Sequence, residues 1–189
     1  MGSISNTSQP CRFEVIPNRS EQIVLDVCHN IDGFRAVLDT IAIRFPDVDN
    51  IKFVFGISKS KTLTEIAQLL EETEKIKDVY VVSRTHMRLH KAEDAHKLLS
   101  VCGLSKLRDI IADPVSHDML ATRSDDTQSD GTISQSGDVF QQNITKTLDT
   151  ILSKKEMQNE KSLLLICGSF FIMSDVKQYF GFTQECDTL

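Results

Sequence analysis

The chain has 189 residues, enough for one domain that buries its own core. Its 21 basic and 27 acidic residues give a net charge of −6, which argues against a nucleic-acid-binding module because such a module needs a basic face. No apolar run reaches the roughly 20 residues of a membrane-spanning helix, so no membrane partner is expected either. Five scattered cysteines without a CxxC pair, behind a polar N-terminus, favour a reducing cytoplasmic compartment.

Short β-branched runs alternate with amphipathic segments along most of the chain. The first half predicts strands over 12–16 and 23–26, a helix over 34–45, a strand over 51–55, a helix over 63–70 and a strand over 79–82. The second half predicts a helix over 91–101, a strand over 107–112, a helix over 139–157, a strand over 162–167 and a helix over 169–180.

This alternation predicts an α/β fold with a Rossmann-like, mostly parallel sheet flanked by helices, because parallel neighbours need long crossover connections. We expect residues 1–9 to be a disordered N-terminus and residues 10–189 to form one domain. The Ser- and Asp-rich stretch 116–138 predicts a long mobile loop, because it has too little to bury to offset its ordering entropy. A dispensable insertion and a phosphorylated regulatory loop both stay open as its role.

Polar residues follow four of the predicted strands, in the segments 26–30, 56–61, 83–88 and 168–169. Ligands of open parallel sheets bind beyond the carboxyl ends of the strands, where helix N-termini present free amides. The cations, hydroxyls and amides of these segments suit an anion such as phosphate or carboxylate. The chain has no GxxxxGK[ST], GxGxxG or GxSxG motif. The sequence therefore predicts anion-binding strand tips without a phosphate-binding loop of their own, which is half of a site.

Each of these residues also has a structural alternative. Asp26 or Asn30 could cap the following helix, His29 could be an ordinary structural histidine, and Gly168 could serve only its turn. Lys59 and Lys61 could be solvated surface. His86 and His90 have a spacing that can hold zinc, but no third ligand stands near them, so we predict no metal site.

The same segments carry a family resemblance. Residues 10–14 (PCRFE) and 24–30 (VLDVCHN) resemble the P-G-R-F-E and L-D-G-A-H-N-P motifs of folylpolyglutamate synthases and dihydrofolate synthases, members of the Mur ligase superfamily. Residues 56–61 are similar to the G-x-x-x-x-K-D loop of that family, and residues 167–169 to its C-G-S junction. The resemblance runs from Pro10 to Phe182 and implies the C-terminal, glutamate-ligase domain.

The resemblance implies an ATP-dependent ligase that activates a carboxyl group of folate or dihydropteroate as an acyl phosphate, which the amine of L-glutamate then attacks. By position it implies that Arg12 and Asp26 bind ATP, that His29, Asn30 and Lys61 are catalytic, and that Gly168 and Ser169 bind glutamate. Mg²⁺ would be held mainly by an N-terminal ATP-binding domain, for which residues 1–9 leave no room. We therefore expect the chain alone to be inactive. Closure of the two domains would keep water from the acyl phosphate.

Four positions depart from the family motifs. Cys11 stands where the motif has Gly, so a position at which the motif favours a positive φ carries a side chain here. Cys28 replaces Ala, Ile31 replaces Pro and Thr62 replaces Asp. A non-enzymatic binding or regulatory protein with a degenerate ligase-domain fold is the alternative function. Chain elongation or addition of the first glutamate, and a cytoplasmic or mitochondrial location, stay open.

Overall fold

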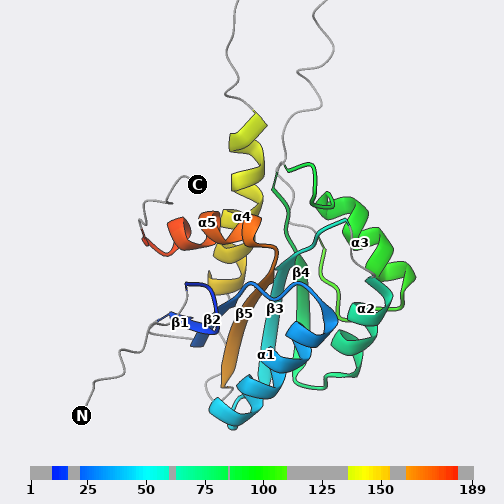
Figure 1. The fold of residues 1–189 in the computed structure, drawn as a ribbon, viewed down its shortest axis with the longest axis vertical. Coiled ribbons are helices and arrows are strands. Elements are labelled where there is room, and N and C mark those ends of the chain that lie inside the picture. The colour runs from blue at the N-terminus through cyan, green and yellow to red at the C-terminus, as the bar shows by residue number, and fades with distance from the viewer. Residues whose placement is uncertain are drawn as a thin grey trace, which may run out of the picture.

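The computed structural model describes residues 10–16, 22–59, 63–84, 86–109, 136–153 and 161–182, with the backbone alone for 136–143. Its elements are β1 (Glu14–Ile16), β2 (Gln22–Asp26), α1 (Ile31–Arg44), β3 (Asn50–Gly56), α2 (Leu63–Glu72), β4 (Ile76–Val81), α3 (Ala92–Val101), α4 (Ser136–Ser153), β5 (Ser162–Gly168) and α5 (Phe170–Tyr179). Figure 1 shows them in place. The segments 1–9 and 116–135, about which the sequence made predictions, lie outside the described residues.

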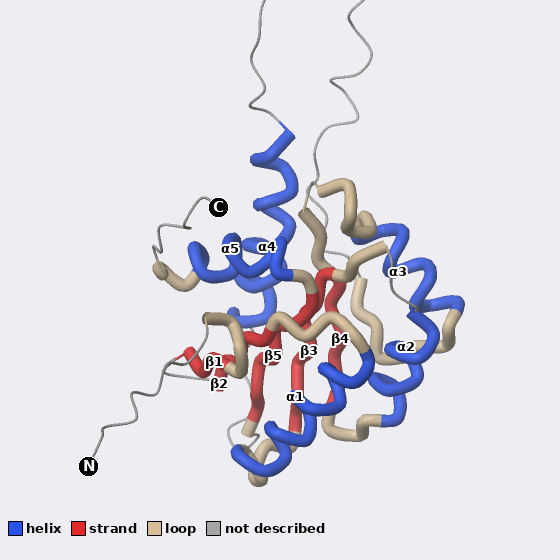
Figure 2. The backbone as a smooth tube through the Cα atoms, in the orientation of Figure 1, coloured by secondary structure: helices blue, strands red, loops and turns tan. Residues whose placement is uncertain are grey.

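The strands form one five-stranded sheet in the order β1-β2-β5-β3-β4. The pairs β2–β5, β5–β3 and β3–β4 are parallel, and only β1 pairs antiparallel, with β2, among the described strands. Figure 2 shows helices on both sides of this sheet, with α1, α2 and α3 apart from α4 and α5. The predicted α/β fold with a mostly parallel, helix-flanked sheet is therefore confirmed.

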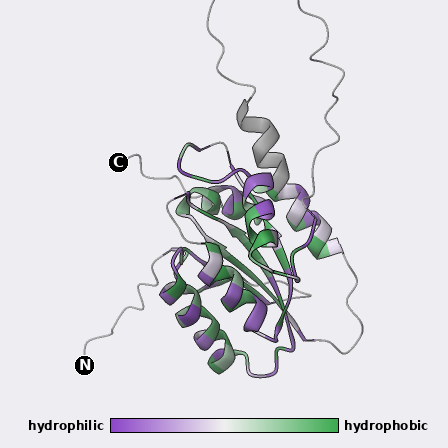
Figure 3. Ribbon diagram, turned by 90° about the vertical axis from the view of Figure 1, so that its right-hand side faces the viewer, coloured by the Kyte–Doolittle hydropathy of each residue, from purple (hydrophilic) through white to green (hydrophobic). Residues whose placement is uncertain are grey.

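Hydrophobic residues on both faces of the central strands hold the helices to the sheet. All seven residues of β5 are buried, as expected of a parallel strand covered on both sides. Phe34 of α1 packs against Phe53 and Phe55 of β3 on one face. Ile172 of α5 and Leu148 of α4 belong to the core on the other face. In Figure 3 the strands are mostly green, and the helices alternate green with purple, so their apolar sides cover the sheet.

The limits of several elements differ from the prediction. Helix α1 begins at Ile31, because Asn30 caps it, and not at Phe34, where the apolar periodicity starts. Strand β4 already begins at Ile76. Helix α4 begins at Ser136, so residues 136–138 of the predicted mobile loop are helical.

The predicted strand over 107–112 is wrong for the part that the structure describes. Leu107 makes one isolated parallel bridge with Val79 of β4, and no strand follows in residues 107–109. Leu107 is only half-buried, and Arg108 and Asp109 are exposed. The segment therefore lacks the two covered faces that stabilise the central strands. Residues 110–112 lie outside the described residues.

No helix within the described part of the chain combines the length and the apolar composition needed to cross a membrane.

Candidate functional site

The carboxyl ends of three neighbouring strands lie side by side. Asp26 at the end of β2 pairs with Cys167 of β5, which pairs on its other side with Phe55 of β3. Gly56 and Gly168 are the last pair of their strands. Because these strands are parallel, the polar segments that follow them emerge at one edge of the sheet.

One pocket at this edge, the strand-tip pocket, has a volume of about 670 Å³. It is lined by His29, Ser58, Lys59, Met87, Arg88, Ser169, Phe170 and Phe171. These residues come from the ends of all four strands that the sequence singled out. The structure thus brings the four predicted segments to one cavity, although Lys61 and Thr62 lie outside the described residues.

Two cations of this pocket are placed by backbone contacts between the segments after β3 and β4. The Lys59 amide donates to the Arg88 carbonyl oxygen at 2.8 Å, and the His90 amide donates to Ile57 at 3.0 Å. Ser58 and Leu89 form an antiparallel bridge between them. Within the described residues, neither the Lys59 nor the Arg88 side chain has a carboxylate partner, so the positive charge of the pocket is available to an anion.

His29 lies where two pockets meet. Its Nδ1 lies 3.1 Å from the Val27 carbonyl oxygen, a contact that favours the proton on Nδ1 and leaves Nε2 as an acceptor. The side chain is exposed and lines both the strand-tip pocket and a smaller one beside α1. The geometry therefore suits a hydrogen-bonding or proton-transfer role between two ligands.

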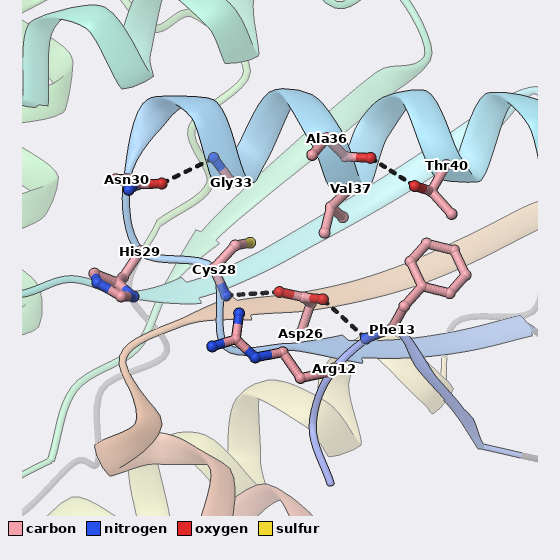
Figure 4. A pocket seen from close by; sticks show the side chains of 10 residues that line it. All are labelled: Arg12, Phe13, Asp26, Cys28, His29, Asn30, Gly33, Ala36, Val37 and Thr40. Atoms are coloured by element: carbon pink, nitrogen blue, oxygen red, sulfur yellow. Dashed lines mark hydrogen bonds between the residues drawn. The ribbon is translucent and has the colours of Figure 1, made fainter. Parts of the chain in front are cut away.

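The smaller pocket, here the α1 pocket, has a volume of about 270 Å³ and is shown in Figure 4. It is lined by Arg12, Phe13, Asp26, Cys28, His29, Asn30, Gly33, Ala36, Val37 and Thr40. Four of the predicted site residues, Arg12, Asp26, His29 and Asn30, are thus together. In Figure 4 the Arg12 side chain lies beside Asp26 and Cys28.

Asp26 and Asn30 both hold backbone amides. The buried Asp26 carboxylate accepts from the Cys28 amide through Oδ1 at 2.7 Å and from the Phe13 amide through Oδ2 at 2.8 Å. Asn30 is the N-cap of α1, and its Oδ1 accepts from the Gly33 amide at 2.8 Å. The capping alternative is therefore observed for Asn30, whereas Asp26 is not a helix cap but joins β2 to the turn that carries Arg12.

That turn is strained at two residues. Cys11 has φ 57° and Phe13 has φ 44°, and they are the two non-glycine residues with positive φ among those that the structure describes. The positive φ expected at Cys11 from the family motif is confirmed. Side chains disfavour this region of backbone space, so other contacts must hold Arg12 between them.

Gly168 and Ser169 lie at the end of β5, where α5 starts. The φ of Gly168 is 113°, and a Cβ there would lie 2.2 Å from the Gly56 carbonyl oxygen, so only glycine fits. The Ser169 amide donates to the same oxygen at 2.8 Å. Ser169 is the N-cap of α5, since its Oγ accepts from the Phe171 amide at 3.4 Å, and it also lines the strand-tip pocket.

The buried Cys167 thiol at the end of β5 is unsuited to nucleophilic chemistry. Burial raises the pKa of the Cys167 thiol well above its ordinary value, and the neighbouring Cys28 and Asp26 add to this effect. The thiol is therefore protonated at neutral pH, whereas the thiolate is the reactive form.

The sequence missed the apolar wall of the strand-tip pocket. Phe170 and Met87 are 70% and 84% exposed although both are large and apolar. His86 stacks on Phe171 with ring centroids 3.6 Å apart and accepts from the Arg88 amide through Nδ1. The adjacent phenylalanines directly after Gly-Ser were the available signal, because they follow the strand end at which the pocket lies. No group of three possible metal ligands occurs in the described residues.

The fold and this edge define an open α/β domain whose strand-tip pocket holds two cations without a carboxylate partner among the described residues. A model of the family described as the glutamate ligase domain of Mur ligases matches residues 11–124. The chain belongs to this family. No protein with a curated description matches it by sequence.

Solved structures similar to this chain are folylpolyglutamate synthases. E. coli FolC in complex with ADP has a TM-score of 0.61 at 18% identity, over 94% of this chain and 33% of that one. The Mycobacterium tuberculosis folylpolyglutamate synthase complexed with ADP and AMPPCP has a TM-score of 0.59 at 16% identity, over 94% and 34%. A bifunctional folylpolyglutamate synthase/dihydrofolate synthase with Mn, AMPPNP and L-glutamate bound has a TM-score of 0.58 at 17% identity, over 94% and 33%.

At these identities the likeness shows a shared fold, and the chain spans about one third of the length of the structures it matches. The predicted resemblance to a Mur ligase C-terminal domain is confirmed.

Proposed function

We propose that residues 10–189 are the C-terminal domain of an ATP-dependent folate:glutamate ligase. The reaction joins a folyl or dihydropteroyl acyl phosphate to L-glutamate through an amide bond. The observation that carries this proposal is the strand-tip pocket, in which Lys59 and Arg88 have no carboxylate partner among the described residues and lie with His29 and Ser169. All three substrates of such a ligase are anions, and their negative charge needs cations of this kind.

L-Glutamate is the ligand that we assign to the strand-tip pocket. Its two carboxylates match Lys59 and Arg88, and the N-terminus of α5 behind Ser169 favours negative charge. His29, at the boundary of both pockets, is placed to accept a hydrogen bond from the attacking amine. One of the similar structures holds L-glutamate together with a nucleotide and Mn.

ATP is assigned to the side of the α1 pocket, where Arg12 is the cation. Both oxygens of the Asp26 carboxylate accept backbone amides, so we propose that Asp26 supports ATP binding by fixing the turn that carries Arg12. Mg²⁺ would supply charge neutralisation of the phosphates. Asp26 lies buried among amides and does not fit as its ligand, which supports the proposal that an N-terminal domain holds the metal.

A domain exchange tests this function. The C-terminal domain of E. coli FolC is replaced by this chain, and glutamate ligation to a reduced folate is measured with ATP and Mg²⁺. We expect ligation by the chimera, its loss on His29→Ala, and no ligation by this chain alone. Arg35→Ala is the matched control, because Arg35 is exposed on α1 and lines neither pocket. A folded chimera that ligates no glutamate would refute the proposal.

A non-enzymatic binding protein is the second candidate. It is favoured by the use of Asp26, Asn30 and Ser169 in backbone hydrogen bonds, since each of these side chains has a structural role whether or not a ligand binds. The two candidates differ in the chimera experiment, because a binding protein would retain glutamate affinity without turnover. A cytoplasmic location is part of either proposal, in line with the free cysteines of the described residues.

A further inference from the structure

Glu14, a residue of neither pocket, has contacts on two sides that point to a role in placing Arg12. Its Oε2 accepts from the Cys11 amide at 2.8 Å and lies 3.0 Å from Lys177 Nζ. Glu14 stands in β1, directly after the turn, whereas Lys177 is in the last turn of α5. The same carboxylate oxygen therefore joins the strained turn to a helix that packs on the sheet.

The turn itself depends on external hydrogen bonds. The positive φ of Cys11 and Phe13 is unfavourable for residues with side chains, and the residue between them is Arg12. Two carboxylates hold the amides on either side of Arg12, Glu14 on Cys11 and Asp26 on Phe13. The Cys11 carbonyl oxygen accepts from the Val27 amide at 2.8 Å. Three hydrogen bonds thus hold the backbone on the two sides of Arg12, which lines the α1 pocket.

The ion pair between Glu14 and Lys177 is largely buried. The Lys177 side chain is 10% exposed and that of Glu14 is 24% exposed, so their charges attract one another more strongly than charges in water. The Lys177 ammonium also lies 6.0 Å from the ring centroid of Phe182. Removal of either partner would leave the other charge half-buried and unpaired, and the hydrogen bond to Cys11 would weaken with it.

We propose that Glu14 and Lys177 are positioning residues that fix the Arg12 turn in its ligand-binding conformation. The pair couples Arg12 to α5, whose other end carries Ser169 at the strand-tip pocket. Helix α5 thus lines the strand-tip pocket at its first residues and contacts, through Lys177, the residue that follows the Arg12 turn. That Arg12 binds the nucleotide rests on the proposed function; that Glu14 and Lys177 fix the turn does not.

The test measures hydrogen exchange of the Cys11 amide by NMR in the full chain, in Glu14→Gln, Glu14→Ala, Lys177→Gln and the double variant Glu14→Gln/Lys177→Gln. We expect Cys11 exchange to rise about tenfold or more in Glu14→Ala and by less in the Gln variants, because Gln can still accept the hydrogen bond. Cys11 exchange in the double variant should equal that in the single Gln variants. Lys177→Arg keeps the positive charge, so its Cys11 amide should exchange as slowly as in the wild type. Glu93→Gln and Lys97→Gln make the same charge changes on exposed positions of α3 and should leave Cys11 unchanged.

Wild-type exchange at Cys11 in Glu14→Ala would overturn the proposal. So would an equal rise in exchange at Cys11 and at Leu165 in the centre of β5, because that outcome means global destabilisation. A parallel titration with Mg-ATP follows the Arg12 Nε–H signal, which should shift in the wild type and respond several-fold more weakly in Glu14→Ala. If ATP leaves the wild-type signal unchanged while Cys11 exchange responds as expected, the nucleotide assignment fails and the positioning role stands.

Discussion

Gly168 approaches Gly56 so closely that a Cβ on Gly168 would lie 2.2 Å from the Gly56 carbonyl oxygen. The same oxygen accepts the Ser169 amide at 2.8 Å. These two contacts hold the ends of β3 and β5 together beside the strand-tip pocket. The glycine of the family's C-G-S junction is required here by close packing and by a φ of 113°, whatever the ligand.

Gly168→Ala should therefore destabilise the chain by about 2 kcal/mol or more, since the added methyl group meets backbone and the φ is strained. Urea unfolding measures this loss. Gly103→Ala is the matched control, because Gly103 has a φ of 86° but no atom within 4 Å of its added Cβ. The control should show the strain alone. Equal losses at the two glycines would mean that the close approach to Gly56 has no energetic weight.

Asn30 permits a separation of its capping role from its proposed catalytic role. Asn30→Ala should lower the free energy of unfolding by about 1 kcal/mol, because the Gly33 amide loses its acceptor. Asn30→Asp should keep that stability, since aspartate is an equally good N-cap, but it replaces the amide donor with a charge. Thermal unfolding and the chimera assay are measured together. Full ligation by Asn30→Asp would restrict Asn30 to the cap.

The central sheet could be predicted because its signal is local. The apolar runs of β3, β4 and β5 need cover on two faces, and parallel order follows from the helices between them. The predicted strand over 107–112 is wrong for residues 107–109, because an apolar run does not reveal whether a second face is covered. Leu107 pairs with Val79 of β4 in an isolated bridge and has no other strand partner among the residues that the structure describes.

The roles of site residues could be predicted only in part. The gathering of four strand tips follows from topology alone. The use of Asp26 does not, because its carboxylate reaches the amide of Phe13, which lies in the turn before β1 and 13 residues away in the sequence. The Glu14–Lys177 contact joins the two ends of the domain and has no local signature either. Such contacts depend on packing that a linear pattern does not contain.

Lys106 should be one of the stabilising residues outside the pockets. Its Nζ donates to the carbonyl oxygens of Leu70, Glu71 and Thr73 at the C-terminal end of α2. Lys106→Met removes these bonds and leaves carbonyls at a helix end without a cation, so we expect a loss of about 1–3 kcal/mol in urea unfolding. Lys97→Met on α3, an exposed position, should change stability little. A smaller effect at Lys106 than at Lys97 would contradict this expectation.

His90 should make stability depend on pH. Burial lowers the pKa of His90 below its ordinary value of 6.5, the nearby Lys59 lowers it further, and Asp94 opposes them. The unfolded chain then binds a proton at a higher pH than the folded chain does. Stability from this group is present above about pH 6.5 and is lost as the pH falls through the folded pKa.

The check is urea unfolding of the wild type and His90→Gln between about pH 8 and pH 5. The difference between the two proteins should change in this range, with the wild type losing more stability on acidification. His96→Gln, on α3, is the matched control. A parallel pH dependence of the wild type and His90→Gln would show that His90 does not contribute.

Lys59 and Arg88 should affect ligand binding without affecting stability. The backbone of each holds the segments after β3 and β4 together, whereas neither side chain has a carboxylate partner among the described residues. Lys59→Gln and Arg88→Gln should therefore unfold like the wild type. In the chimera each should raise KM for L-glutamate by about ten- to a hundredfold, because one charge-assisted contact of roughly 1.5–3 kcal/mol is lost. The kcat should change less, since a substrate carboxylate is held equally in the ground and transition states.

Lys97→Gln and Arg35→Gln are the controls, because both positions are exposed and lie outside both pockets, and they should leave KM unchanged. If Lys59→Gln and Arg88→Gln changed kcat alone, these cations would act on the phosphoryl group, and glutamate would have to bind elsewhere.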